Sequence, residues 1–97
     1  DLLCYFGALD GVMQGVRQQL QPGGTFFLSV ESTDSAGDRG WVLGRHGRYA
    51  HSAAYVAATA RAAGLTILSL EPESIRTEAG VPAPGLFAVL QRPDRAG

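Results

Sequence analysis

The side chains with the clearest capacity for chemistry are gathered in one short stretch of this 97-residue chain. Arg45, Arg48, Tyr49, His51 and Tyr55 fall within eleven positions. The stretch precedes and enters a predicted helix, and a helix N-terminus favours anions. A substrate that carries a carboxylate or a phosphate would therefore suit these residues. The alternative is structural, with the arginines in solvent and the tyrosines covering the core.

Two of these side chains could also move a proton. His51 or Tyr49 could act as a general base if the reaction requires one. Glu31 ends an apolar strand-like segment, and ligands of open α/β sheets bind beyond the carboxyl ends of strands. Glu31 is therefore a candidate for orienting a ligand, although it could instead anchor the loop that follows. No catalytic dyad is visible, so the catalytic residues stay unassigned.

Other chemistries lack the residues that they need. His46 and His51 are five positions apart, but no Cys, Asp or Glu is placed to complete a metal-ligand set. Cys4 lies in an apolar run, where a buried thiol is inert. The patterns G-x-S-x-G, G-x-G-x-x-G and the P-loop are all absent. We predict no metal site, no hydrolase nucleophile and no phosphate cradle.

Composition sets further bounds on the function. Hydrophobic residues make up 45% and charged residues 18%, which is typical of a globular chain. The net charge of −1 gives no reason to expect nucleic acid or a membrane surface as a partner. A single cysteine cannot form an internal disulfide, which favours a cytoplasmic location. The chain begins at Asp1 in mid-pattern, and we interpret it as a piece of a longer protein.

The elements that must position these residues follow an α/β pattern. Apolar residues from Val12 to Leu20 form one helical stripe, with Asp10 as the predicted N-cap and Pro22-Gly23-Gly24 as the stop. The uninterrupted apolar run Thr25–Val30 predicts a strand covered on both faces, as in a parallel sheet. The predicted boundaries are 1–24 for the first segment and its helix, 25–31 for the strand, 32–51 for a loop that acts as a lid, 52–64 for a helix capped by Ser52, 65–92 for a strand and hairpin, and 93–97 for a tail.

Four stretches together resemble a known family. LQPGGTFFLSVES resembles the passage from a helix into strand five of class I S-adenosylmethionine-dependent methyltransferases. DLLCYFGAL, GRYAHSAAYV and IRTEAGVPAPGLFAVLQRP resemble, in the same order, segments of the bacterial predicted methyltransferases of the TPR-repeat-associated type. These stretches are spread along the chain from residue 1 to residue 93. A half of another α/β enzyme, such as a dehydrogenase, would share the general pattern but would not explain GRYAHSAAYV or the motif of the final hairpin.

The resemblance implies a fold and a cofactor site. The fold would be the carboxyl-terminal part of a Rossmann-like methyltransferase sheet with two helices. Strand seven (Leu86–Arg92) would lie antiparallel between strand five (Thr25–Val30) and strand six (Leu65–Ser74). Asp1 would face the methionine moiety of S-adenosylmethionine, and Tyr5 and Phe6 would follow in a turn beside the active site. Ala8 stands where the family has an acidic residue.

The same resemblance implies that much of the cofactor site lies outside this chain. The glycine-rich turn and the acidic residue that holds the ribose belong to the amino-terminal half of the family's domain. We therefore expect a fragment of a methyltransferase that acts on a small molecule and is inactive without that half. The alternative is a truncated or degenerate relative that serves as a binding or assembly module. We also expect an exposed strand edge at Thr25–Val30 that pairs with the missing half or with a second copy.

Overall fold

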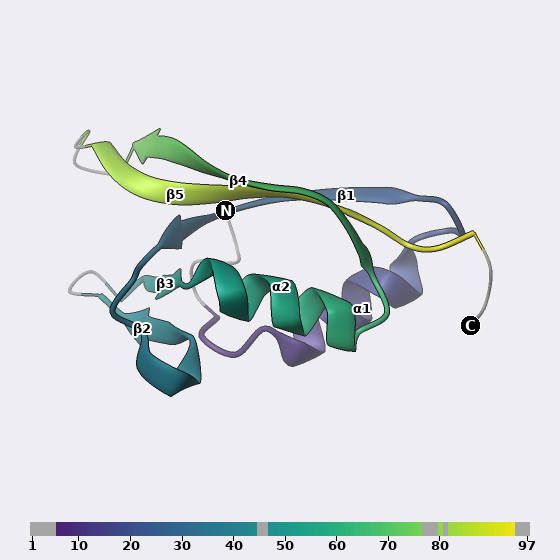
Figure 1. Cartoon of the computed structure of the whole chain (residues 1–97), viewed down its shortest axis with the longest axis horizontal. Helices are drawn as coiled ribbons and strands as arrows, with labels where there is room; N and C mark the ends of the chain where they lie inside the picture. The colour runs from purple at the N-terminus through teal and green to yellow at the C-terminus, as the bar shows by residue number, and fades with distance from the viewer. Residues whose placement is uncertain (1–5, 45–46, 77–79, 81, 95–97) are drawn as a thin grey trace.

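The computed structural model describes residues 6–44, 47–76, 80 and 82–94, and for residue 76 the backbone only. The elements along these residues are α1 (Asp10–Gln19), β1 (Thr25–Ser32), the 3₁₀ turn η2 (Gly37–Arg39), β2 (Trp41–Leu43), β3 (Tyr49–His51), α2 (Ala53–Ala62), β4 (Thr66–Arg76) and β5 (Pro82–Gln91). The strands form one sheet in the order β2-β3-β1-β5-β4. In Figure 1 the long strands run along the top and both helices lie beneath them, so the helices cover one face of the sheet.

The three long strands lie side by side in the sheet. β5 lies between β1 and β4 and is antiparallel to both. Its pairing with β1 runs from Thr25 opposite Gln91 to Glu31 opposite Gly85. The pairing with β4 is longer and contains a bulge between Ile67 and Ser69. The β4–β5 hairpin therefore extends beyond the part of the sheet that β1 reaches.

The N-cap of helix α1 lies one residue earlier than the sequence predicts. Leu9 occupies the N-cap position and makes no side-chain cap bond, whereas Asp10 is the first helical residue. The prediction that Asp10 caps the helix is therefore wrong, although its charge still interacts favourably with the helix dipole. At the other end, Arg92 Nη1 donates to the carbonyl oxygens of Leu20 at 2.7 Å and Arg17 at 3.2 Å. Arg92, which follows β5, thus binds carbonyl oxygens at the end of α1 that have no partner within the helix.

Helix α2 follows its local signals. Ser52 is the N-cap, and its Oγ accepts a hydrogen bond from the backbone N–H of Tyr55 at 3.1 Å, as predicted. The alanine-rich sequence has a high helix propensity. Val56, Thr59 and Ala60 form the buried side of the helix. Because two of these side chains are small, α2 packs close to the sheet and against α1.

The segment 32–51 is more ordered than the predicted loop. It contains η2, β2 and β3, and β3 joins the sheet parallel to β1 through Glu31 opposite Ala50 and Ser32 opposite His51. β2 then pairs antiparallel with β3. The prediction that this segment is a loop is wrong where β2 and β3 form, because three-residue strands leave too little periodicity to be detected in a sequence. Its role as a lid stays a prediction.

β1 is covered on one face only. Leu28 and Val30 are buried beneath the helices, whereas Phe27, which points the other way, is 61% exposed. The prediction of a strand covered on both faces is therefore wrong for the part of the chain that the structure describes. The buried hydrophobic core consists of Leu9, Met13, Leu28, Val30, Val56, Ala60, Leu65, Leu86, Ala88 and Leu90. Neither described helix has the length and apolar character needed to cross a bilayer.

Candidate functional site

His51 lies at the end of β3 and is fully buried. Its Nε2 atom is 2.9 Å from the carbonyl oxygen of Phe6 and 3.0 Å from that of Gly7. Carbonyl oxygens only accept hydrogen bonds, so Nε2 carries a proton and donates it to both. Nδ1 is then an acceptor, and it is buried without a partner among the residues described. His51 thus fixes the backbone that precedes α1.

Burial also sets the charge of this imidazole. Removal from water lowers the pKa of His51 below its ordinary value of 6.5, and the bonds to Gly7 and Phe6 oppose that shift only in part. Desolvation disfavours the charged form, because a buried imidazolium would lose its hydration. His51 is therefore neutral at neutral pH, with its proton on Nε2.

Tyr55, in the first turn of α2, holds the next part of the same backbone. Its ring stacks on His51 with the centroids 6.1 Å apart and the planes 12° from parallel. Its hydroxyl oxygen accepts a hydrogen bond from the N–H of Leu9 at 2.8 Å. Because Leu9 is fully buried, that N–H would otherwise have no access to water.

Trp41 packs on the same turn from β2. A Cβ atom added to Gly7 would lie 2.4–2.7 Å from atoms of the indole ring, so only glycine fits there. The indole in turn contacts Tyr49 edge-on at 5.3 Å, and the Arg39 guanidinium lies 3.9 Å above its ring. We call His51, Tyr55 and Trp41 the aromatic clamp, and the backbone of residues 6–9 is what it holds.

Gly40 allows the turn before β2 to lie close to α2. Its φ of +85° lies in the left-handed region, and an added Cβ would meet the Tyr55 side chain at 2.4 Å. The N–H of Ser52 donates to its carbonyl oxygen at 2.9 Å. The turn before β2 therefore packs directly against the first turn of α2.

The structure brings only some of the predicted site residues together. His51, Tyr55 and Tyr49 lie on the helix side of the sheet, linked through Trp41. Arg48 is half-buried and precedes β3. Glu31 alternates with the buried Val30, so it belongs to the opposite face. Glu31 and His51 therefore do not share one site.

Four other predicted residues need separate mention. Phe6 is 47% exposed, and its carbonyl oxygen is held by His51. Asp1, Tyr5 and Arg45 lie outside the described residues. The roles predicted for all of these side chains in binding a cofactor or a substrate stay predictions. No group of three His, Cys, Asp or Glu side chains within the described ranges is arranged to hold a metal ion.

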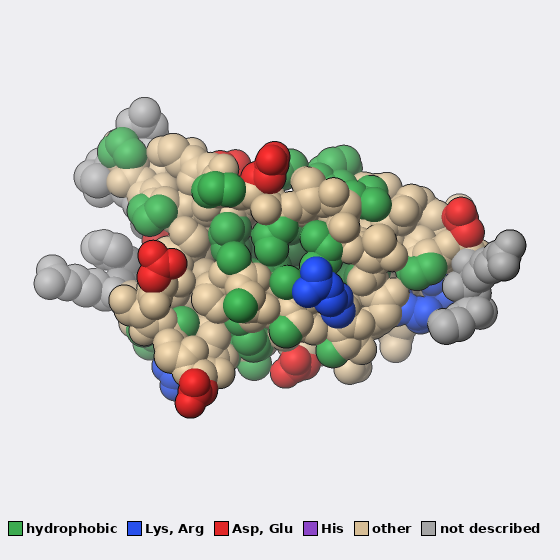
Figure 2. Space-filling model, in the orientation of Figure 1, with side chains coloured by type: hydrophobic (Ala, Val, Ile, Leu, Met, Phe, Trp, Pro, Cys, Tyr) green, Lys and Arg blue, Asp and Glu red, His purple; other side chains and the backbone are tan. Residues whose placement is uncertain are grey.

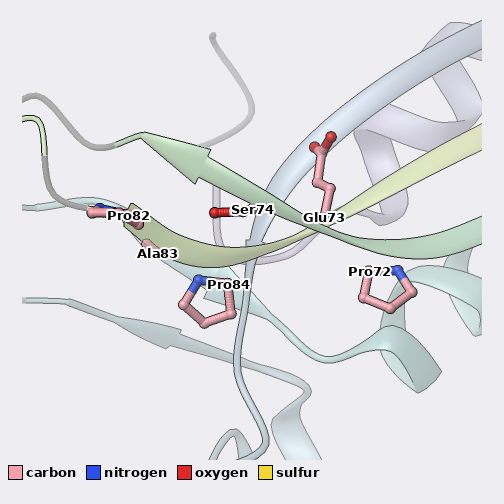
Figure 3. Close-up of a pocket in the computed structure, with 6 residues that line it drawn as sticks. All are labelled: Pro72, Glu73, Ser74, Pro82, Ala83 and Pro84. Atoms are coloured by element: carbon pink, nitrogen blue, oxygen red, sulfur yellow. The ribbon is translucent and has the colours of Figure 1, made fainter.

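Hollows also lie elsewhere on the surface of the described residues, and two of them are well defined. One, of about 460 Å³, lies on the β4–β5 hairpin and is lined by Pro72, Glu73, Ser74, Pro82, Ala83 and Pro84. Figure 3 shows Pro72 and Pro84 on one side of the hairpin and Glu73 directed to the other. The second, of about 400 Å³, is lined by Gly15, Val16, Gln18, Gln19, Leu20 and Phe26. Neither contains a residue that the sequence predicted for binding.

The sequence did not mark Gly7, Gly40 or Trp41 as functional residues. Glycines and an isolated tryptophan in a polar segment have many structural uses, and their partners are distant in the sequence. The strongest available signal was that Trp41 is the one tryptophan of the chain and lies in an otherwise glycine-rich and charged segment. Such a residue in a loop-like stretch needs a surface on which to pack.

Comparison with known proteins gives the fold. No protein-family model matches the chain, and no curated protein matches it significantly. A solved SAM-dependent methyltransferase from Methanosarcina mazei superposes with a TM-score of 0.70 at 14% sequence identity. The match covers 89% of this chain and 51% of the methyltransferase, so this chain spans about half of that protein's length. The chain is thus a mixed α/β unit with the fold of part of a methyltransferase.

Proposed function

We propose that this chain is the carboxyl-terminal part of a Rossmann-like, S-adenosylmethionine-dependent methyltransferase domain, of the TPR-repeat-associated type. The observation that carries the proposal is the antiparallel β5 between β1 and β4, with both helices on one face. In the sheet of that family, β1, β5 and β4 would correspond to strands five, seven and six. The likeness to the solved methyltransferase supports this assignment.

The aromatic clamp brings two of the motifs that resemble the family into direct contact. Tyr55 and His51 come from GRYAHSAAYV, and they hold the backbone of Phe6 to Leu9 from DLLCYFGAL. In the proposed enzyme, Asp1, Tyr5 and Phe6 line the methionine end of the cofactor. The clamp then acts as a support that keeps this turn in place, since a small displacement of a positioning group slows a reaction strongly.

Among the described residues, the cofactor contact that we propose is with the methionine end of S-adenosylmethionine. The half-exposed ring of Phe6, on a backbone fixed by His51, offers an apolar contact to a ligand. When bound, S-adenosylmethionine supplies an electrophilic methyl group on a sulfonium. The contribution of this chain is to orient that group and to exclude water through Phe6 and its neighbours. The acceptor is a small molecule, and the positive charges of Arg45 and Arg48 favour one that carries negative charge.

A non-catalytic binding or assembly module is the second candidate. The buried state of His51 favours it, because a base enclosed on every side cannot reach a substrate. Tyr49, the other candidate base, packs on Trp41. An upstream G-x-G-x-G turn in the complete reading frame supports the enzyme, and its absence supports the module.

Calorimetric titration with S-adenosylhomocysteine tests the assignment. We expect the protein encoded by the complete reading frame to bind at micromolar concentration, and the 97-residue chain alone to show no such binding. A Phe6→Ala variant of the complete protein should bind at least tenfold more weakly, whereas the exposed Leu43→Ala should bind as before. Failure of the complete protein to bind would refute the enzyme, and micromolar binding by the short chain would refute its dependence on the other half.

The free edge of β1 is a second reason to expect a partner for this chain. β3 pairs with β1 only at Glu31 and Ser32, so the segment 25–30 has no strand beside it on that edge among the described residues. Unpaired backbone groups on an apolar strand favour the addition of another strand. We propose that the missing half, in the cytoplasm, pairs here and that the isolated chain self-associates instead. A clean monomer in sedimentation at micromolar concentration would contradict this.

A further inference from the structure

The β4–β5 hairpin continues past the end of β1. β1 pairs with β5 as far as Glu31 opposite Gly85, whereas β4 and β5 remain paired as far as Arg76 opposite Pro82. Because β1 and β5 are antiparallel, the additional residues of the hairpin lie beyond the carboxyl end of β1. Ligands of open α/β sheets bind beyond the carboxyl ends of strands. The hairpin therefore extends over the end of the sheet where a ligand is expected.

The helix side of this extension is exposed and mainly apolar. Pro72 pairs with Leu86, which belongs to the buried core, so the ring of Pro72 points to the side of the sheet on which the helices lie. Ser74, Pro82 and Pro84 share that side, because side chains alternate along a strand. All four side chains are exposed, so the helices do not cover them. In Figure 2, hydrophobic side chains, a class that includes proline, are visible on the surface of the hairpin.

These four side chains line the hollow of about 460 Å³, together with Glu73 and Ala83. This volume falls within the range of about 300–1,000 Å³ that is typical of small-molecule sites. Pro72 and Pro84 lie on one side of the hairpin and Glu73 points to the other (Figure 3), where its carboxylate accepts a hydrogen bond from the hydroxyl of Ser29. Among the described side chains, the hollow thus presents three proline rings and one hydroxyl group, and no charge.

The missing half of the proposed domain is expected to lie away from this hollow. That half would pair with the free edge of β1, and β5 separates β1 from β4. The face left for its helices is the one that carries the exposed Phe27, whereas the hollow is on the opposite face. The second hollow, which includes Phe26, lies where β1 begins, and so at the wrong end of the strand for a ligand of such a sheet.

The lining of the hairpin hollow favours an aromatic ring. Proline rings and aromatic faces pack well on each other, as when proline-rich segments bind in grooves lined by aromatic side chains. Here the prolines belong to the protein, so the aromatic group belongs to the ligand. The hydroxyl of Ser74 can donate or accept a hydrogen bond at the side of such a ring. We propose that the hollow binds an uncharged aromatic ring that carries a hydroxyl or amino group.

The identity of the molecule that carries this ring rests on the function proposed above. In a methyltransferase, the ring belongs to the methyl acceptor, because the hollow and the carboxyl end of β1 lie at the same end of the sheet. A charged group of the acceptor lies outside the hollow, since the described side chains that line it offer no ion pair. The acceptor is thus a small aromatic compound, bound by its ring to the hairpin.

Titration with phenol, followed through the NMR signals of the backbone amides of this 97-residue chain, tests the ring site. We expect saturable shifts at millimolar phenol for the amides of Ser74, Ala83 and Gly85. Cyclohexanol has a ring of the same size and the same hydroxyl group but no aromatic face. It should therefore bind more weakly than phenol, by roughly threefold or more.

Substitutions locate the site. Pro84→Ser should weaken the binding of phenol by roughly fivefold or more, because a ring that packs on the ligand is lost. Pro22→Ser, at an exposed proline in the turn after α1, should leave binding unchanged. Ser74→Ala should weaken the binding of phenol but not that of toluene, which has no hydroxyl group. Ser74 is exposed, so this variant tests the hollow even if circular dichroism shows that Pro84→Ser disturbs the hairpin.

Several outcomes would overturn the ring site. Shifts confined to residues outside the hairpin would place the site elsewhere, and equal binding of cyclohexanol would remove the role of the aromatic face. Equal effects of Pro84→Ser and Pro22→Ser would show that the prolines do not form the site. Loss of phenol binding in the protein encoded by the complete reading frame would show that the missing half covers the hollow.

The assignment of the ring to the acceptor has a separate test. In the complete protein, phenol and S-adenosylhomocysteine should bind at the same time, because an acceptor and a cofactor occupy adjacent sites. Competition between them would overturn this assignment. Phenol binding needs neither the cofactor nor methyl transfer, so a complete protein that binds phenol but not S-adenosylhomocysteine would refute the enzyme and leave the ring site standing.

Discussion

Replacement of His51 tests the aromatic clamp most directly. His51→Leu removes the donor to the carbonyl oxygens of Phe6 and Gly7. The bond to Gly7 is buried, so its oxygen would be left without a partner, at a penalty of about 1–3 kcal/mol. Phe6 is half-exposed, and water can replace the second bond. We therefore expect the free energy of unfolding to fall by about 2 kcal/mol.

His51→Gln separates hydrogen bonding from charge. The glutamine Nε2 group can donate to the same carbonyl oxygens but does not titrate. In the wild-type protein, the lowered pKa of His51 means that the unfolded state takes up a proton first as the pH falls. Stability due to His51 is therefore complete above pH 6.5 and decreases below it, by about 1.4 kcal/mol per pH unit until the folded pKa is reached. The glutamine variant should lack this component.

Urea denaturation followed by circular dichroism, at several pH values between 7.5 and 4.5, measures both effects. Carboxylates also titrate at the lower end of this range, so the quantity of interest is the difference between the wild type and His51→Gln at each pH. That difference should shrink as the pH falls below 6.5. A difference that does not change with pH would contradict the lowered pKa of His51. A leucine variant as stable as the wild type would show that His51 does not hold the turn as described.

Three further substitutions have defined outcomes, each measurable as a change in the urea midpoint. Gly40→Ala places a side chain on a left-handed backbone and against Tyr55, so we expect the free energy of unfolding to fall by roughly 2 kcal/mol or more. An unchanged urea midpoint would contradict this packing. Ser52→Ala removes the cap of α2 and should lower stability by about 0.5–2 kcal/mol, with Ser52→Asp as the variant that retains it. Arg92→Met leaves the carbonyl oxygen of Leu20 to water and should lower stability by about 1 kcal/mol, whereas Arg92→Lys should recover part of the loss.

Much of the fold could be predicted because its signals are local. The cap at Ser52 and the run of alanines define α2 within a few residues, and both are present in the structure. The strand predicted over residues 25–31, from the apolar run Thr25–Val30, extends one residue further, to Ser32. The position of β5 followed from the family resemblance, since nothing in the periodicity of a strand names its neighbours.

The candidate site was harder to predict because its contacts are distant in the sequence. His51 and Tyr55 were singled out as groups that could meet a ligand, yet their partners are backbone atoms more than 40 positions away. A sequence shows which side chains can donate or accept, but only the packing shows which group receives the bond. The uncovered face of β1 has a similar cause, because a run of apolar residues shows what needs to be buried and not what buries it.

The prolines of the hairpin have a consequence for how the sheet ends. Pro72 lies in β4, an edge strand of the sheet, and Pro82 and Pro84 lie in the part of β5 that β1 does not reach. Proline has no N–H to donate to an approaching strand, so these residues guard the hairpin against the addition of a foreign strand. The free part of β1, residues 25–30, contains no proline and no charged residue. The prolines thus disfavour the addition of a strand to the hairpin, whereas the free edge of β1 can accept one. A strand that joins this sheet is therefore expected to pair with β1.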